Sequence, residues 1–222
     1  MPNYDVVYNK EDYLRHMAQL TPADYSFHNR DGYFYKEETD RLLKIFISSS
    51  LYFPDSARYG GAAIIITFYD VETLFSEVLR HFPLKGYEYR EYYRTCETAF
   101  LTKQDYGETI FNFLADKDVE TDADFQEVKP HLQQAIDHCL AFSDQYKTHT
   151  DLYLAFKDLP GSERRKVISQ PLPHKWAIIL KLNNDSGYEN YINSLIDYYT
   201  NDRPEPLEVD FFNALKERLS QL

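Results

Sequence analysis

The stretch AAIIITFYDVETLFSEVLRHF, residues 62–82, contains the clearest periodic pattern in the chain. In its second half, apolar residues recur at offsets of 0, 3, 4, 7, 8 and 11, the spacing of one face of an amphipathic helix. They are Val71, Leu74, Phe75, Val78, Leu79 and Phe82. Pro83 follows directly, and proline cannot continue a helix because it has no amide hydrogen. We therefore predict a helix that ends at Pro83.

The first half of the same stretch fits two structures. Ile64, Thr67 and Phe68 continue the helical spacing toward Val71. The β-branched and aromatic composition of residues 64–69 also suits a buried strand. We prefer one long buried helix, with a strand as the alternative.

Further helices are predicted on both sides of this stretch. Thr39 is placed to cap a helix that carries the apolar run from Leu42 to Ile47. Pro130 is expected in the first turn of a helix with an apolar stripe that extends to Tyr146. Two more stripes follow, over residues 188–199 and 207–222. The run WAIILKL, residues 176–182, fits either a strand or a helix.

These segments predict a mainly α fold, an irregular bundle or stack of about seven to nine helices with at most a minor element of two or three strands. No internal repeat supports a regular solenoid. We expect a single helical domain over residues 1–222, with a weak alternative boundary near residues 115–124, where acidic residues accumulate.

The composition excludes several classes of function. The chain has 24 Lys and Arg against 36 Asp and Glu, a formal net charge of -12, which repels nucleic-acid phosphates and anionic lipid. The mean hydropathy is -0.57, and no apolar run is long enough to predict a membrane span. Two cysteines, Cys96 and Cys139, cannot form a disulfide framework. We expect a cytoplasmic protein that binds neither nucleic acid nor membrane.

Motifs of catalysis and cofactor binding do not occur in the sequence. It contains no GxGxxG, GxxxxGKS/T, HExxH, GxSxG or CxxC pattern, so we expect neither a cofactor nor a metal site. His131 and His138 share one helical face but lie two turns apart, about 10 Å along the axis, too far to chelate one ion directly. His28 and Asp31 lie in a predicted turn.

One basic segment interrupts the acidic chain. Arg164, Arg165 and Lys166 are consecutive, and arginine can bind phosphate or carboxylate through two parallel hydrogen bonds. These residues are the candidate anion site. The alternative is that they pair with acidic neighbours or face solvent.

Two adjacent features favour a protein partner. A predicted surface helix carries Tyr89, Tyr92 and Tyr93, and tyrosine rings provide a large contact area at low entropic cost. The acidic stretch that follows would speed association with a basic surface. Its candidate binding residues are Asp116, Asp118, Glu120, Asp122 and Asp124. The alternative is a solvated loop beside a helix whose tyrosines face the core.

The preferred hypothesis is a non-catalytic binding protein for a basic partner. Small acidic inhibitors of toxic enzymes, such as bacterial immunity proteins, share this size, charge and lack of catalytic motifs, although the similarity is one of composition only. One alternative is a metal- or phosphate-dependent enzyme with a site between helices, where histidines and arginines converge. The other is a helical scaffold or assembly protein. The sequence leaves the partner and the oligomeric state open.

Overall fold

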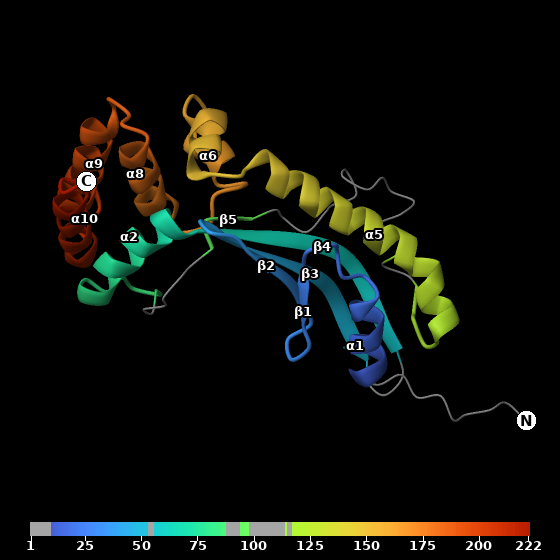
Figure 1. The fold of residues 1–222 in the computed structure, drawn as a ribbon. Coiled ribbons are helices and arrows are strands. Elements are labelled where there is room, and N and C mark those ends of the chain that lie inside the picture. Colours follow the sequence, from blue (N-terminus) through green and yellow to red (C-terminus); the bar gives the residue numbers. More distant parts are fainter. Residues whose placement is uncertain (1–9, 53–55, 88–93, 98–113, 115–116) are drawn as a thin grey trace, which may run out of the picture. The chain divides into compact units, whose positions relative to one another are not determined.

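The structure is a computed structural model, and it describes residues 10–52, 56–87, 94–97, 114 and 117–222. In this part of the chain it contains five strands, eight α-helices and one π-helix (Figure 1). The strands are β1 (Ser26–His28), β2 (Tyr33–Glu37), β3 (Arg41–Tyr52), β4 (Ser56–Phe68) and β5 (Cys96–Glu97). The helices are α1 (Lys10–Ala18), α2 (Tyr69–His81), α5 (Asp122–Gln145), α6 (His149–Phe156), α7 (Gly161–Arg164), α8 (Leu172–Leu182), α9 (Tyr188–Asp197), the π-helix η1 (Tyr198–Asp202) and α10 (Pro206–Leu219).

The strands form one sheet in the order β1–β2–β3–β4–β5, so each lies beside the next strand in the sequence. β2 runs antiparallel to both β1 and β3, with Phe34 opposite Phe27 on one side and Ile45 on the other. Our prediction of a mainly helical bundle with a minor strand element is therefore wrong. The N-terminal half of the chain builds a five-stranded sheet.

β3 shows why the sequence pattern was misleading. Arg41, Leu43 and Ile45 are buried and alternate with half-buried residues, as in a strand with one covered face. The intervening positions include Leu42 and Phe46, so the segment is apolar on both faces and also fits a helical period. The predicted helix after Thr39 is wrong. The segment fits both a helix and a strand, and its hydrogen bonding with β2 makes it a strand.

The decisive stretch 62–82 is half strand and half helix. Its second half is α2, as predicted, but residues 62–68 complete β4 and do not extend the helix. The change occurs at Phe68, which is still extended with φ -84° and ψ 118°. The amide of Tyr69 donates to the carbonyl of Asp40 at 3.0 Å, which fixes the start of the helix. The preferred continuous helix is wrong, and the alternative strand is correct.

Other predicted helices are present with different limits. The run 176–182 belongs to α8, and the two C-terminal stripes correspond to α9 and α10. Pro130 lies inside α5, which begins earlier, at Asp122, so its predicted place in the first turn is wrong. Most of the predicted tyrosine helix lies outside the described residues, and Cys96, which was expected on its stripe, is in β5.

The chain divides into two compact units that alternate along the sequence. Unit 1 comprises Met1–Glu38, Leu42–Ile65 and Glu97–Gln145, and unit 2 comprises Thr39–Arg41, Ile66–Cys96 and Tyr146–Leu222. The single domain over residues 1–222 stays a prediction.

Unit 1 joins α1 and α5 to the sheet through aromatic contacts. Tyr13 of α1 stacks on Tyr59 of β4, and Tyr59 meets Phe125 of α5 edge to face. The His16 ring stacks on Phe125 with centroids 4.0 Å apart, and its Nε2 lies 2.7 Å from Oδ1 of Asp122. The first turn of α5 is thereby attached to α1.

Unit 2 is built mainly of helices. α10 packs on α2, α8 and α9, and α8 packs on α2, α6 and α9. Trp176, Phe75, Phe211 and Phe212 are among its fully or almost fully buried side chains. This aromatic core fixes the C-terminal helices, which carry the candidate surfaces described next.

Candidate functional site

The predicted acidic site is largely occupied by internal ion pairs. Asp118 accepts hydrogen bonds from Nε and Nη2 of Arg58 at 2.6 and 2.9 Å, which lower the pKa of its carboxyl. Asp122 accepts from Nη2 of Arg15 and contacts His16, and its pKa is lowered to about 2. Both carboxylates are therefore engaged in contacts within unit 1.

Two further members of the acidic stretch differ in their surroundings. Asp124 lies 2.9 Å from the ammonium of Lys117 and accepts hydrogen bonds from Thr121 at the start of α5. Glu120 is exposed. The other candidates, Asp116, Tyr89, Tyr92 and Tyr93, lie outside the described residues.

The predicted anion site has a clear structural role at its first residue. The guanidinium of Arg164 lies over the ring of Trp176, 4.2 Å from its centroid, and donates to the carbonyls of Phe156 and Lys157 at 3.0 Å each. Lys166 forms an ion pair with Glu163 at 2.7 Å, whereas Arg165 is exposed.

The histidines considered for metal binding lie in unit 1. His131 and His138 are both on α5, and Nδ1 of His28 lies 3.5 Å from Oδ2 of Asp31. Among the described residues, no group of three or more histidine, cysteine, aspartate or glutamate side chains is arranged to hold a metal ion.

A buried ion pair in unit 2 was not found from the sequence. Nζ of Lys175 lies 3.1 Å from Oε1 of Glu72, and both side chains are 0% exposed. The hydroxyl of Thr95 donates to the same carboxylate oxygen at 2.8 Å and accepts from the amide of Phe68. Lys175 also donates to the carbonyl of Arg94. This network connects α2, α8 and the end of β4, and its full burial gives it a structural role.

The C-terminal region contains a group of acidic and exposed apolar residues, close in sequence, that we call the C-terminal acidic surface. Between residues 197 and 210 there are five carboxylates and one guanidinium, from Arg203, which forms an ion pair with Glu205 at 2.8 Å. Two large apolar side chains are exposed within it, Tyr198 by 41% and Leu207 by 52%. We define the surface by Asp197, Tyr198, Asp202, Glu205, Leu207 and Asp210.

Three carboxylates of this surface differ from those of the 116–127 stretch. Within the part of the chain that the structure describes, Asp197, Asp202 and Asp210 form neither an ion pair nor a side-chain hydrogen bond. All three are exposed. Their negative charge is therefore available to an outside partner.

An aromatic column supports this surface from within unit 2. Tyr198 meets Tyr199 edge to face, Tyr199 stacks on Phe212, and Phe212 stacks on His174 with centroids 4.4 Å apart. Nε2 of buried His174 lies 2.8 Å from Oε2 of Glu208. Tyr198 also begins η1, and π-helical turns occur frequently at functional sites.

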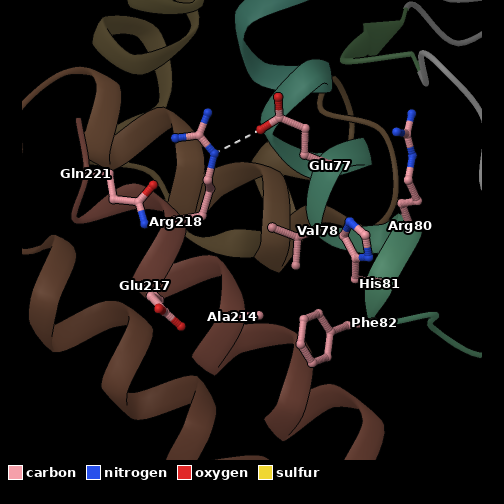
Figure 2. Close-up of a pocket in the computed structure, with 9 residues that line it drawn as sticks. All are labelled: Glu77, Val78, Arg80, His81, Phe82, Ala214, Glu217, Arg218 and Gln221. Atoms are coloured by element: carbon pink, nitrogen blue, oxygen red, sulfur yellow. Dashed lines mark hydrogen bonds and ion pairs between the residues drawn. The ribbon is translucent and has the colours of Figure 1, made fainter.

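A pocket of about 370 Å³ lies between α2 and α10, as Figure 2 shows. Val78 and Ala214 supply apolar surface, and Phe82 is 39% exposed at its edge. Nε of Arg218 donates to Oε2 of Glu77 at 2.9 Å and links the two helices. No sequence pattern indicates this pocket, because its residues come from segments far apart in the chain.

Comparisons with known proteins identify no relative of this chain. No protein-family model matches the chain, and no match was found among curated proteins or among solved structures. In the described part of the chain, no helix combines the length and apolar character needed to cross a membrane.

Proposed function

We propose that the protein is a non-catalytic acidic binding module that inhibits a basic partner, as an immunity-type protein neutralises a basic toxin or enzyme in the bacterial cytoplasm. The C-terminal acidic surface is the observation that supports this proposal. Three of its carboxylates, Asp197, Asp202 and Asp210, have no cationic partner among the described residues, and two apolar side chains are exposed beside them in the sequence. Charge accelerates association with a basic protein, and buried aromatic contacts supply most of the affinity.

The two kinds of side chain would have different roles in the complex. Tyr198 can accept an arginine or lysine over its ring, and Leu207 can pack against the aliphatic part of the same side chains. Asp197, Asp202 and Asp210 can pair with the cationic groups around them. Tyr198 is held edge to face by Tyr199, which stacks on the core, and this support reduces the entropy lost on binding.

The test begins with capture of a partner. The immobilised protein is exposed to lysate from its own source at low salt, and proteins released at high salt are identified and purified. Each purified basic protein is then titrated with the wild type and with the triple variant Asp197→Asn, Asp202→Asn, Asp210→Asn. We expect a stoichiometric complex that the triple variant weakens by about tenfold or more.

A matched triple variant controls for overall charge. Asp24→Asn, Asp137→Asn and Asp158→Asn remove the same number of charges from exposed positions outside the surface and outside the 116–127 stretch. This control should change the dissociation constant by less than about twofold, whereas Tyr198→Ala should weaken binding by about tenfold or more. The absence of a basic partner, or an equal effect of both triple variants, would disprove the proposal. The enzyme and scaffold alternatives stay predictions.

A further inference from the structure

The pocket between α2 and α10 is independent of the C-terminal acidic surface and of the function proposed for it. Its volume of about 370 Å³ is near the lower end of the range for small-molecule sites, roughly 300–1,000 Å³. A ligand of the size of an amino acid or a dipeptide would fill it. Three of its lining residues, Val78, Phe82 and Ala214, are apolar and the others are charged or polar, so the lining offers both apolar contact and groups that can orient a ligand.

The polar groups of the pocket carry opposite charges. In the described part of the chain, the Glu217 carboxylate has neither an ion-pair nor a hydrogen-bond partner. Arg218 uses only Nε in its contact with Glu77, so its two terminal nitrogens are available as donors among the described residues. One group can accept a cation, and the other can donate to an anion.

The apolar part of the pocket lies beside these charges. Figure 2 shows Ala214 between Glu217 and Phe82, with Val78 above it and the Glu77–Arg218 pair at the far end. The Phe82 ring has no aromatic partner among the described residues, and it is 39% exposed. An apolar ligand group could therefore cover this ring and lie against Val78 and Ala214.

We propose that the pocket binds a small zwitterion with an apolar side chain, an amino acid or a dipeptide. Its ammonium group contacts Glu217, its carboxylate contacts the terminal nitrogens of Arg218, and its side chain packs on Phe82. Ligands that carry only one of the two charges lose one charge-assisted contact and bind more weakly.

Three probes with the same phenyl group test this arrangement: L-phenylalanine, phenethylamine and 3-phenylpropionate. Each is titrated into the 15N-labelled full chain at neutral pH, and amide shifts are followed by NMR. We expect saturable shifts at α2 and α10 with L-phenylalanine, and binding about tenfold weaker with the two singly charged probes. The absence of saturable shifts at these helices with all three probes would overturn the proposal.

A variant of Glu217 tests the contact with the ammonium group separately from the contact with the carboxylate. Glu217→Gln should weaken L-phenylalanine and phenethylamine by about tenfold and leave 3-phenylpropionate unchanged. Phe82→Ala should weaken all three probes, and the matched variant Glu120→Gln in unit 1 should weaken none. Thermal unfolding of each variant confirms that it is folded. If Glu217→Gln lowered the affinity of all three probes equally, or of none, the zwitterion assignment would be wrong.

Discussion

The Lys175 ammonium lies 3.1 Å from the Glu72 carboxylate, and neither side chain exposes any surface to solvent. The pair joins α8 to α2 in the middle of unit 2. A buried ion pair of this kind adds little to the stability of the fold compared with apolar residues of the same shape, because the cost of removing both charges from water offsets their attraction. Removal of one partner is costly, since the other charge then stays buried.

The first prediction concerns this pair. Lys175→Met should lower the free energy of unfolding by about 3–5 kcal/mol, because the Glu72 carboxyl group then stays buried without its cationic partner. The double variant Glu72→Gln, Lys175→Met should be more stable than Lys175→Met alone, since the amide still accepts from Thr95. Urea unfolding followed by circular dichroism measures both. A Lys175→Met variant as stable as the wild type would contradict this account.

The second prediction concerns pH. Burial lowers the pKa of His174 below its usual 6.5, although the bond with Glu208 acts in the opposite direction. At a pH between the lowered pKa of the folded state and the pKa of 6.5 in the unfolded state, the unfolded chain binds more protons than the folded one. The contribution of neutral His174 to the free energy of unfolding is therefore fully present above pH 6.5 and decreases as the pH falls. His174→Gln should show a smaller decrease. Thermal unfolding at a series of pH values for both proteins tests this, and parallel curves would disprove it.

The third prediction separates structure from anion binding at Arg164. Arg164→Lys should lower the free energy of unfolding by about 1–2 kcal/mol, because lysine cannot both stack on Trp176 and donate to two carbonyls. Arg165→Lys, at the exposed neighbouring position, should change it by less than about 0.5 kcal/mol. Chemical denaturation distinguishes the two variants. Equal stabilities would mean that the Arg164 contacts contribute nothing.

The fourth prediction concerns thiol chemistry. Burial raises the pKa of Cys139 to about 12, so almost none of it is thiolate near pH 8. Cys139 should react with an aromatic disulfide reagent much more slowly in the folded protein than in urea. Mass spectrometry of the trapped products identifies the cysteine that has reacted. Rapid labelling of Cys139 in the folded protein would show that its segment opens readily.

The sequence predicted the helices whose apolar residues occupy one face only. α2, α9 and α10 have such stripes, and each is present. It failed in β3 and β4, where both faces are apolar and the strand period is hidden. A strand that is buried on both faces is covered by elements distant in the sequence, and these elements cannot be predicted from the local spacing of its apolar residues.

The candidate sites were harder to predict for the same reason. The charge of the 116–127 stretch was visible in the sequence, but its pairing with Arg58 and Arg15 depends on the fold. The Glu72–Lys175 pair and the pocket at Phe82 both join residues that lie more than a hundred positions apart in the sequence. In contrast, the acids and the exposed Tyr198 near residue 200 are close in sequence, and a scan for local charge could have found them.

The alternation of the two units along the chain affects how the protein can be synthesised. The amide of Tyr69 donates to Asp40, and Nη1 of Arg41 donates to the carbonyl of Tyr146, so unit 2 needs segments that leave the ribosome at very different times. The apolar surface of α2, which is synthesised early, is covered only after α8 and α10 have been synthesised. Unit 2 can therefore complete its core only after α10 has been synthesised, and until then the apolar surfaces of its early segments are open to chaperones.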